Sequence, residues 1–235
     1  TNVDIQELKQ EYERNQQNVT WNMNSPVNGD YSPAYWNNPY FDRYQNYSSD
    51  DRNRVLAGAN LSIDLTKDLN ILGRVTIDNS NDRQELRKAK GSHAEEFGLS
   101  ALDETSGYSL YTRSFLQTTY DFIATYDLKF SDRISAKLLG GSTFIKSKTD
   151  SFEGSTTGGL VAPGLYTLAN SISFVAPNEQ EINYDKLGMY AQASIDYNKT
   201  VFLEGSYRRD QSSALPTNNN KYDYYSIGTS FILSE

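Results

Sequence analysis

The stretch Arg54–Asp78 alternates apolar and polar residues, with a single interruption at residues 66–68. The first apolar row runs from Val55 to Leu65, and the second runs from Leu69 to Ile77. Side chains point alternately to the two faces of a β-strand, so each half of the stretch predicts a strand with one apolar and one polar face. The short interruption predicts a tight turn between the two strands.

The same alternation recurs along the chain and predicts seven strands. They cover residues 53–65, 69–78, 113–128, 133–147, 185–197, 200–209 and 222–234. The connections at 66–68, 129–132 and 198–199 are short, those at 79–112 and 148–184 are long, and 210–221 is intermediate. Compact soluble domains rarely carry two such long loops, whereas outer-membrane barrels combine short periplasmic turns with long external loops.

The two faces of the expected strands differ in charge. The central part of the apolar face has no charged residue in any strand. A Lys or Arg on a lipid-facing position costs about 2–4 kcal/mol at the bilayer midplane, so this exclusion is expected in a membrane. The opposite face carries many charges, which a wide water-filled or plugged lumen solvates. They include Arg54, Asp64, Arg74, Asp121, Lys137, Lys186, Glu204 and Arg208.

These patterns predict an all-β fold: a segment of a large antiparallel transmembrane β-barrel, with about seven strands here and long extracellular loops. Bacterial single-chain barrels have even strand counts, so seven strands indicate part of a larger barrel. The prediction requires hydrocarbon, and not a second protein layer, over side chains such as Leu61, Phe122 and Ile195.

Two other interpretations remain open. One is a soluble or surface-anchored β-sandwich that binds glycans, because sandwich strands also alternate. Against it, the expected strands reach ten or more residues, whereas strands in globular proteins average about five or six. The other is a passive porin or adhesin barrel, which the alternation does not distinguish from a transporter.

The N-terminal residues follow a different pattern. Asp4 and Glu7 form a capping-box pattern, and Ile5, Leu8 and Tyr12 share one helical face. This predicts a helix over 5–16, followed by irregular structure. The expected organisation is therefore an extracellular loop region with a short helix over 1–51 and a partial transmembrane β-barrel over 52–235.

Composition narrows the function classes. The chain has 235 residues and a net charge of −8, which argues against nucleic acid as a partner. It has no cysteine, which excludes disulfides, thiolate metal sites and cysteine nucleophiles. No apolar run approaches the roughly 18 residues of a transmembrane helix, and the N-terminus has no signal-peptide core.

A cluster of aromatic residues in the N-terminal loop region, between Tyr31 and Tyr47, is the strongest candidate for a binding surface. Aromatic faces stack on sugar rings and pack well at protein interfaces. The alternative is that the segment packs on itself. Asn38-Pro39-Tyr40 predicts a fixed turn inside it. The residues predicted to contact a ligand or a lid protein are Tyr35, Trp36, Tyr40, Phe41 and Tyr44.

Other motifs indicate little chemistry. The segment DNSND (78–82) spaces oxygen ligands as calcium loops do, but it lacks the later Gly and Glu, so a solvated turn is expected. GSTTGG (154–159) lacks the Lys of a phosphate loop. His93 is the single histidine, and the paired carboxylates at 50–51 and 95–96 are expected to be solvated. We therefore expect no metal site, no cofactor and no enzymatic activity.

Several segments resemble the mid-barrel region of SusC/RagA-type TonB-dependent transporters of Bacteroidota. The most specific is R-x-D-x-S-S-x-L-P, formed by Arg208, Asp210, Ser212, Ser213, Leu215 and Pro216. The Arg-Arg-Asp run at 208–210 is expected to form a lumen-to-loop ion pair, and a structural role is favoured over substrate binding. The other similar segments are NPYFDRY (38–44), residues 51–78, GLYTLANS (164–171), residues 186–207 and YYSIGTSFILSE (224–235).

The resemblance implies a barrel of about 22 strands that is plugged by an N-terminal domain. It also implies a SusD-like surface lipoprotein as a hinged lid, and TonB-driven import of oligosaccharides or peptides across the cell outer membrane. The TonB box, the plug and the closing strands are not found in this sequence. The expected partners are thus the lipoprotein, TonB through other parts of the protein, outer-membrane lipid and a glycan or peptide substrate, with no nucleic acid.

Overall fold

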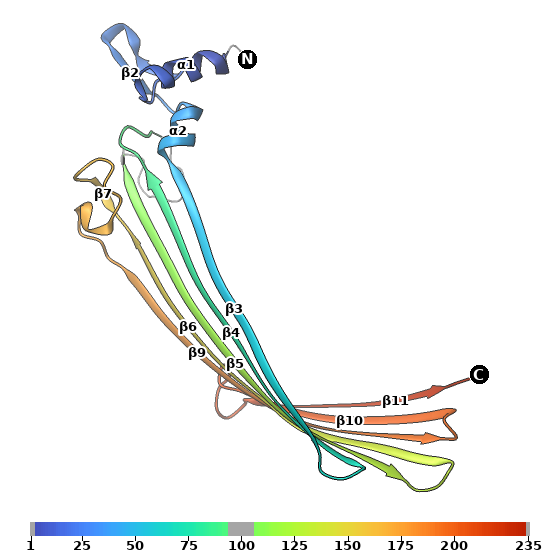
Figure 1. The fold of residues 1–235 in the computed structure, drawn as a ribbon. Helices are drawn as coiled ribbons and strands as arrows, with labels where there is room; N and C mark the ends of the chain where they lie inside the picture. The colour runs from blue at the N-terminus through green and yellow to red at the C-terminus, as the bar shows by residue number, and fades with distance from the viewer. Residues whose placement is uncertain (1–2, 94–105, 234–235) are drawn as a thin grey trace. The chain divides into compact units, whose positions relative to one another are not determined.

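The computed structural model describes residues 3–93 and 106–233. Its main element is one antiparallel sheet of seven strands in the order β11-β10-β9-β6-β5-β4-β3 (Figure 1). The strands are β3 (Tyr47–Asp64), β4 (Leu69–Lys88), β5 (Gly107–Lys129), β6 (Ile134–Ser155), β9 (Asn178–Tyr197), β10 (Val201–Ser212) and β11 (Lys221–Phe231). The predicted all-β class and strand number are confirmed, and the described residues form no second large sheet of the kind a sandwich needs.

The three short turns lie where the alternation is interrupted. The β3–β4 and β5–β6 turns close with backbone hydrogen bonds from Leu65 to Leu69 (2.9 Å) and from Phe130 to Ile134 (3.1 Å). Between β9 and β10, Asn198 and Lys199 have φ of 57° and 54°. Positive φ at both central residues is the geometry of a two-residue type I′ hairpin turn.

Most of the strands are longer than the alternation predicted, but β11, expected over 222–234, ends at Phe231. β4 continues to Lys88, β5 begins at Gly107, β6 ends at Ser155 and β9 begins at Asn178. The loops expected at 79–112 and 148–184 are therefore wrong in extent, and β3 begins several residues before the expected boundary. The outer parts of these strands carry polar residues on both faces, as in NSNDRQELRK (79–88), so they give no apolar alternation.

The chain divides into two compact units. Unit 1 comprises Thr1–Asn53, Asn81–Ser114 and Asp150–Gln180, and unit 2 comprises Arg54–Ser80, Phe115–Thr149 and Glu181–Glu235. Among the described residues, the buried hydrophobic side chains of unit 1 are Leu8, Tyr12, Phe41, Ala89, Tyr108 and Leu160, whereas unit 2 has only Ala136. Unit 2 thus has almost no hydrophobic core of its own.

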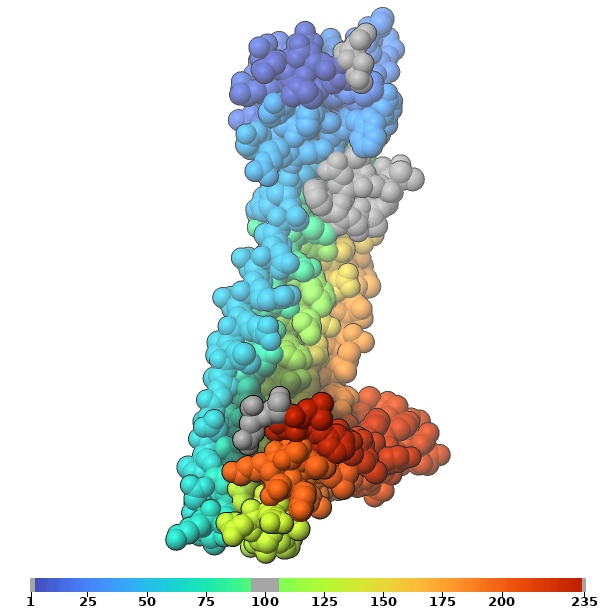
Figure 2. Space-filling model, turned by 90° about the vertical axis from the view of Figure 1, so that its right-hand side faces the viewer, coloured from blue at the N-terminus to red at the C-terminus, as the bar shows by residue number. Residues whose placement is uncertain are grey.

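Unit 1 begins with the helix that the sequence predicted. α1 (Ile5–Asn15) is capped by the Asp4 carboxylate, which accepts a hydrogen bond from the Gln6 backbone N–H at 2.8 Å. Leu8 and Tyr12 are buried, but Ile5 is exposed. The residues coloured blue in Figure 2, from α1 onwards, gather into one compact body.

The segment expected to be irregular contains further elements. They are β1 (Met23–Ser25), η1 (Pro26–Asn28), β2 (Asp30–Pro33) and α2 (Pro39–Gln45). Asn38-Pro39-Tyr40 begins α2 and is not an isolated turn: Asn38 caps the helix by accepting from the Tyr40 N–H at 2.9 Å, and Pro39 occupies the first helical position. Phe41 of α2 packs with Tyr12 and Ala89 in the core.

Buried asparagines complete the interior of unit 1. The Asn38 side chain is fully buried and donates to the carbonyls of Leu8 (2.8 Å) and Val19 (2.7 Å). Asn18 donates to Asn37, and Asn46 accepts from the Ala89 N–H at 2.7 Å. Buried polar groups stabilise a fold only when they are satisfied, so these amides specify the path of the surrounding backbone.

The connection from β6 to β9 is also structured. It contains β7 (Thr157–Leu160), η2 (Leu168–Asn170) and β8 (Ser171–Ser173). Gly158 and Gly159 of the GSTTGG segment have φ of 78° and 95°, a conformation that favours glycine. The glycines lie inside β7, where the register of its pairing with β8 shifts between Thr157 and Leu160.

Candidate functional site

One face of the sheet in unit 2 is an exposed apolar surface. We call this face, which carries Leu61, Phe122 and Ile195, the outward face, and the opposite face the inner face. Large side chains that alternate along the strands are open to solvent, with exposed fractions of 64% for Leu61, 52% for Phe122 and 45% for Ile195. These three residues were the test of the membrane prediction, and among the described residues no second sheet or helix buries them. Monomeric soluble proteins rarely expose contiguous apolar surface of this kind.

Aromatic side chains lie toward both ends of this apolar face. Tyr126 and Tyr197 are close in sequence to the short turns. Phe144 and Tyr207 lie midway along β6 and β10, where each is the last residue of its apolar row before the charged Lys146 and Arg209. The rings of Tyr120 and Phe144 stack with centroids 6.4 Å apart. Aromatic residues at both limits of an apolar band are typical of membrane barrels.

The first charges on the outward face of β10 and β11 follow these aromatics. Arg209 donates to Asp223 at 2.7 Å and 3.0 Å, and the Tyr207 hydroxyl donates to the same carboxylate at 2.5 Å. This ion pair lies directly across the β10–β11 ladder. The charges are therefore neutralised where the apolar band ends.

The inner face of unit 2 carries polar pairs that bridge each neighbouring pair of strands. Two of them are arginine–aspartate ion pairs, Arg54 with Asp78 (2.6 Å) and Arg74 with Asp121 (2.8 Å). Asp121 also accepts from Thr143 at 2.7 Å. The others are Lys137–Asp127, Ser135–Asp196, Lys186–Asp210 and Ser206–Ser226. Water and salt screen these exposed pairs, so they indicate a hydrated surface and contribute little to stability.

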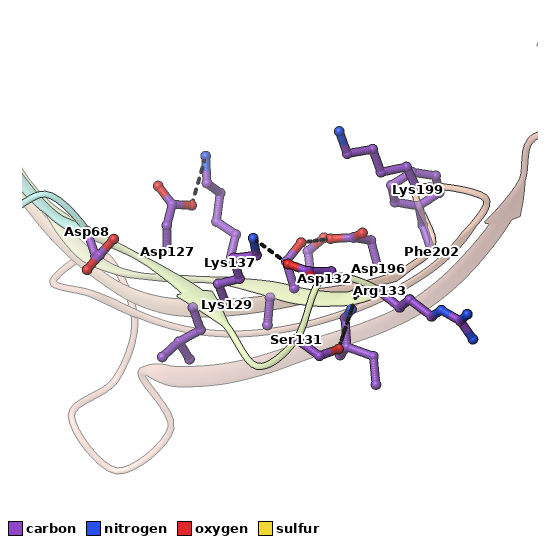
Figure 3. A pocket seen from close by; sticks show the side chains of 15 residues that line it. Asp68, Asp127, Lys129, Ser131, Asp132, Arg133, Lys137, Asp196, Lys199 and Phe202 are labelled. Atoms are coloured by element: carbon purple, nitrogen blue, oxygen red, sulfur yellow. Dashed lines mark hydrogen bonds and ion pairs between the residues drawn. The ribbon is translucent and has the colours of Figure 1, made fainter.

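A polar pocket of about 500 Å³ lies at the short-turn end of this inner face (Figure 3). Lys137 pairs with Asp127 at 3.5 Å, and Lys129 pairs with Asp132 at 3.0 Å. Asp196 accepts from Ser135, and Lys199 and Phe202 lie at the opposite side of the pocket. Acidic and basic groups alternate around it, so it offers no concentrated charge of one sign.

The five aromatic residues predicted as contacts have different environments. Tyr35, Trp36 and Tyr44 are 52%, 60% and 64% exposed. Tyr44 stacks on the buried Tyr12 with ring centroids 5.6 Å apart. Tyr40 is partly buried against the core, and Phe41 is 4% exposed inside it. Only the first three are available to a ligand or partner in this conformation.

Sequence reasoning missed two residues of this surface. Trp21 is 49% exposed and meets Tyr35 edge to face, with centroids 5.6 Å apart. Asn22 is buried, and its side-chain oxygen accepts from the backbone N–H groups of Tyr35 and Trp36, both at 3.0 Å. We call Trp21, Tyr35 and Trp36 the aromatic surface. An asparagine one position after a tryptophan gives no sequence signal that could have identified this role.

A polar cleft of about 380 Å³ also lies in unit 1. Its walls come from the end of α1, from β2 and from residues 90–91. Its polar side chains are three amides, a hydroxyl, a phenol and the cation Lys90, and the apolar side chains of Val19, Pro33 and Phe41 also line it. Hydrogen-bonding groups of this kind suit sugars and peptide backbones equally.

Arginine side chains form ion pairs and ring contacts at the ends of the strands that lie away from the short turns. Asp82 in β4 pairs with Arg52 (2.5 Å) and Arg113 (3.3 Å), and the hydrogen bond from Arg52 is the main reason that the pKa of its carboxyl is below the usual range. Arg87 lies between two rings, 4.6 Å from Tyr47 and 5.3 Å from Tyr166. Burial raises the pKa of Tyr166.

Most of the other sequence candidates have structural roles. DNSND lies inside β4, not in a turn, and its Asp78 and Asp82 pair with arginines. His93 donates its backbone N–H to Asn37 at 2.8 Å. Glu95 and Glu96 lie outside the described residues. In the described part of the chain, no group of three His, Cys, Asp or Glu is arranged to hold a metal ion.

The R-x-D-x-S-S-x-L-P motif spans the end of β10 and the connection to β11. Ser213 donates its backbone N–H to the Asp185 carbonyl at 2.9 Å, and its hydroxyl accepts from the Asp185 N–H at 2.8 Å. The Pro216 carbonyl accepts from the Asn219 N–H at 2.8 Å, and Leu215 is 37% exposed. Ser212 donates to the Asn220 carbonyl at 3.1 Å. These residues fix the loop, whereas Arg208 and Asp210 face the inner side of the sheet.

No helix in the described residues has the length and apolarity to cross a membrane. No protein-family model and no curated protein matches the chain. Among solved structures, the chain resembles the RagAB peptide transporter, with a TM-score of 0.72 at 19% identity.

Two further matches are the RagAB peptide importer in the open-open state (TM-score 0.69, 20% identity) and in the closed-closed state (0.71, 19%). In all three, the match covers 87% of this chain and 23% of the other. At these identities the similarity shows a shared fold, and the chain spans less than a quarter of the length of the chains that it matches.

Proposed function

We propose that this chain forms part of the barrel wall of an outer-membrane, TonB-dependent importer of SusC type. The observation that carries the proposal is the outward face of unit 2, where uncharged apolar side chains are exposed on a single sheet. Hydrocarbon is the environment that this face fits, and its polar inner face fits a water-filled path. The fold shared with RagAB supports the proposal.

In this proposal the short turns face the periplasm and unit 1 faces the cell exterior. The aromatic surface of unit 1 docks a SusD-like lid lipoprotein or contacts substrate. The substrate is a peptide or an oligosaccharide, and the similarity to a peptide importer favours the peptide. TonB acts through parts of the protein outside this sequence, and the chain does no chemistry on the substrate.

Cell fractionation tests the location. The full-length protein expressed from its own gene should sediment with outer membranes and require detergent for release. Recovery of intact protein in the soluble fraction would refute the proposal.

Uptake tests the mechanism. Deletion of the gene should abolish uptake of the labelled substrate class, and deletion of TonB should have the same effect. A passive porin would keep its uptake without TonB, so persistent uptake in that strain would contradict energy-driven import.

A further inference from the structure

A row of three side chains crosses the inner face of β9, β10 and β11. Arg208 lies directly opposite Tyr190 on β9 and opposite Tyr224 on β11. Directly opposed residues of an antiparallel pair point to the same face of the sheet. The guanidinium carbon of Arg208 is 5.5 Å from the centre of the Tyr190 ring, within the range of a cation–π contact.

Two glycines let this row lie flat against the sheet. A Cβ atom on Gly188 would come within 2.5 Å of Arg208 Nη2 and 2.7 Å of Asp210 Oδ1. A Cβ atom on Gly141 would come within 2.8 Å of the Tyr190 ring. Because Gly188 and Gly141 have no side chains, the guanidinium of Arg208 and the ring of Tyr190 can pack directly against the backbone at these positions.

One edge of the Arg208 guanidinium is already occupied. Its Nε donates to Asp210 at 2.8 Å, and Asp210 also pairs with Lys186 at 3.1 Å. Two cations and one anion leave the cluster with a net charge of +1. The Arg208 side chain is 39% exposed. Its terminal nitrogens make no other hydrogen bond within the described part of the chain.

We propose that Tyr190, Arg208 and Tyr224 form a binding site for a carboxylate group on a ligand that passes along the inner face. A guanidinium presents two parallel N–H donors that match the two oxygens of a carboxylate. The flanking phenol rings offer flat surfaces to the group that bears the carboxylate, either a peptide chain or a sugar ring. The site rests on the proposed function, because that function makes this face a water-filled path.

The test measures binding to the full-length protein in detergent. The first arm compares a short uncharged peptide that has a free C-terminal carboxylate with the same peptide as its C-terminal amide. The second arm compares an oligouronate with its methyl ester. We expect the free acid to bind at least tenfold more tightly in one arm, which also identifies the source of the carboxylate.

Variants test whether the preference for the free acid depends on the row of Tyr190, Arg208 and Tyr224. Arg208→Gln should weaken acid binding about 10- to 100-fold and leave binding of the amide or ester unchanged. Arg74→Gln is the matched control, because Arg74 is also an ion-paired arginine of the inner face. Gly188→Ala keeps every functional group but displaces the guanidinium, so it should also weaken acid binding. Gly228→Ala, where an added Cβ meets nothing within 4 Å, should not.

A heat-modifiable band on a gel confirms that each variant is folded. Equal binding of acid and neutral ligands, or equal effects of Arg208→Gln and Arg74→Gln, would overturn the site. So would the absence of acid-dependent binding in both arms. These results are independent of cell fractionation, so a failed site leaves the outer-membrane proposal intact, and a soluble location would refute that proposal by itself.

Discussion

At the scale of single residues, Asn22 links the polar interior of unit 1 to its exposed aromatics. One buried amide accepts from two consecutive backbone N–H groups and donates to the Trp36 carbonyl at 2.9 Å. Buried polar groups without partners cost about 1–3 kcal/mol each, so the backbone of the aromatic surface depends on the hydrogen bonds of this side chain.

Asn22→Ala should therefore loosen residues 20–37 and lower local stability by about 1–3 kcal/mol. Limited proteolysis of the full-length protein should show faster cleavage in this segment. Asn24→Ala is the control, since Asn24 is exposed and bonds only to Ser32 and Pro33. Identical cleavage rates for the two variants would show that Asn22 does not hold the aromatic surface.

The sequence predicted an aromatic contact surface but not the exposure of its individual residues. Tyr40, Phe41 and Tyr44 are close neighbours in one short helix, yet Phe41 is buried and Tyr44 is open to solvent. The difference depends on where α1 and residues 89–93 pack against α2. Those contacts join segments far apart in the chain, and local alternation contains no information about them.

At the scale of elements, the apolar alternation marks only part of most of the strands. It predicted the turn-side ends of the strands closely, because there the two faces have different surroundings. It failed beyond Ile77 in β4, where Arg52, Asp82 and Arg113 form ion pairs and polar side chains occupy both faces. A strand with similar surroundings on both faces gives no period-2 signal.

A charge on the outward face should block assembly. Phe122→Lys places a cation in the apolar band and should cost about 2–4 kcal/mol near the midplane. Thr125→Lys, on the opposite face of the same strand, is the matched control. The measurement is the amount of heat-modifiable protein in outer membranes. Equal amounts for the two variants would contradict hydrocarbon contact at Phe122.

At the scale of the whole molecule, the two units are stabilised differently. Unit 1 has a small hydrophobic core and buried amides, whereas Ala136 is the one buried hydrophobic residue in the described part of unit 2. Hydrophobic burial is the main favourable contribution to folding in water. A sheet without such burial requires another environment, and the proposed function supplies it as lipid.

The absence of cysteine in this sequence offers a test of orientation. Val27→Cys places a thiol in unit 1 at a position that is 95% exposed, and Asp132→Cys places one in the β5–β6 turn, where the native side chain is 97% exposed. A membrane-impermeant maleimide should label the first in intact cells and the second only after the outer membrane is permeabilised. Labelling of Asp132→Cys in intact cells would show that the β5–β6 turn faces the cell exterior and would contradict the proposed orientation.

The long polar reach of β4 has an evolutionary consequence. Between Leu69 and Ile77, insertion of one residue would exchange the lipid-facing and water-facing sets, so only changes in steps of two preserve the pattern. Beyond Ile77 both faces of β4 carry polar side chains, so a single inserted residue exchanges one polar side chain for another. The buried Asp82 and its ion pairs with Arg52 and Arg113 limit where such an insertion fits. We expect length differences among homologues to accumulate in this reach. Under the proposed function, such differences change the rim of the wall and leave the height of the bilayer-spanning belt constant.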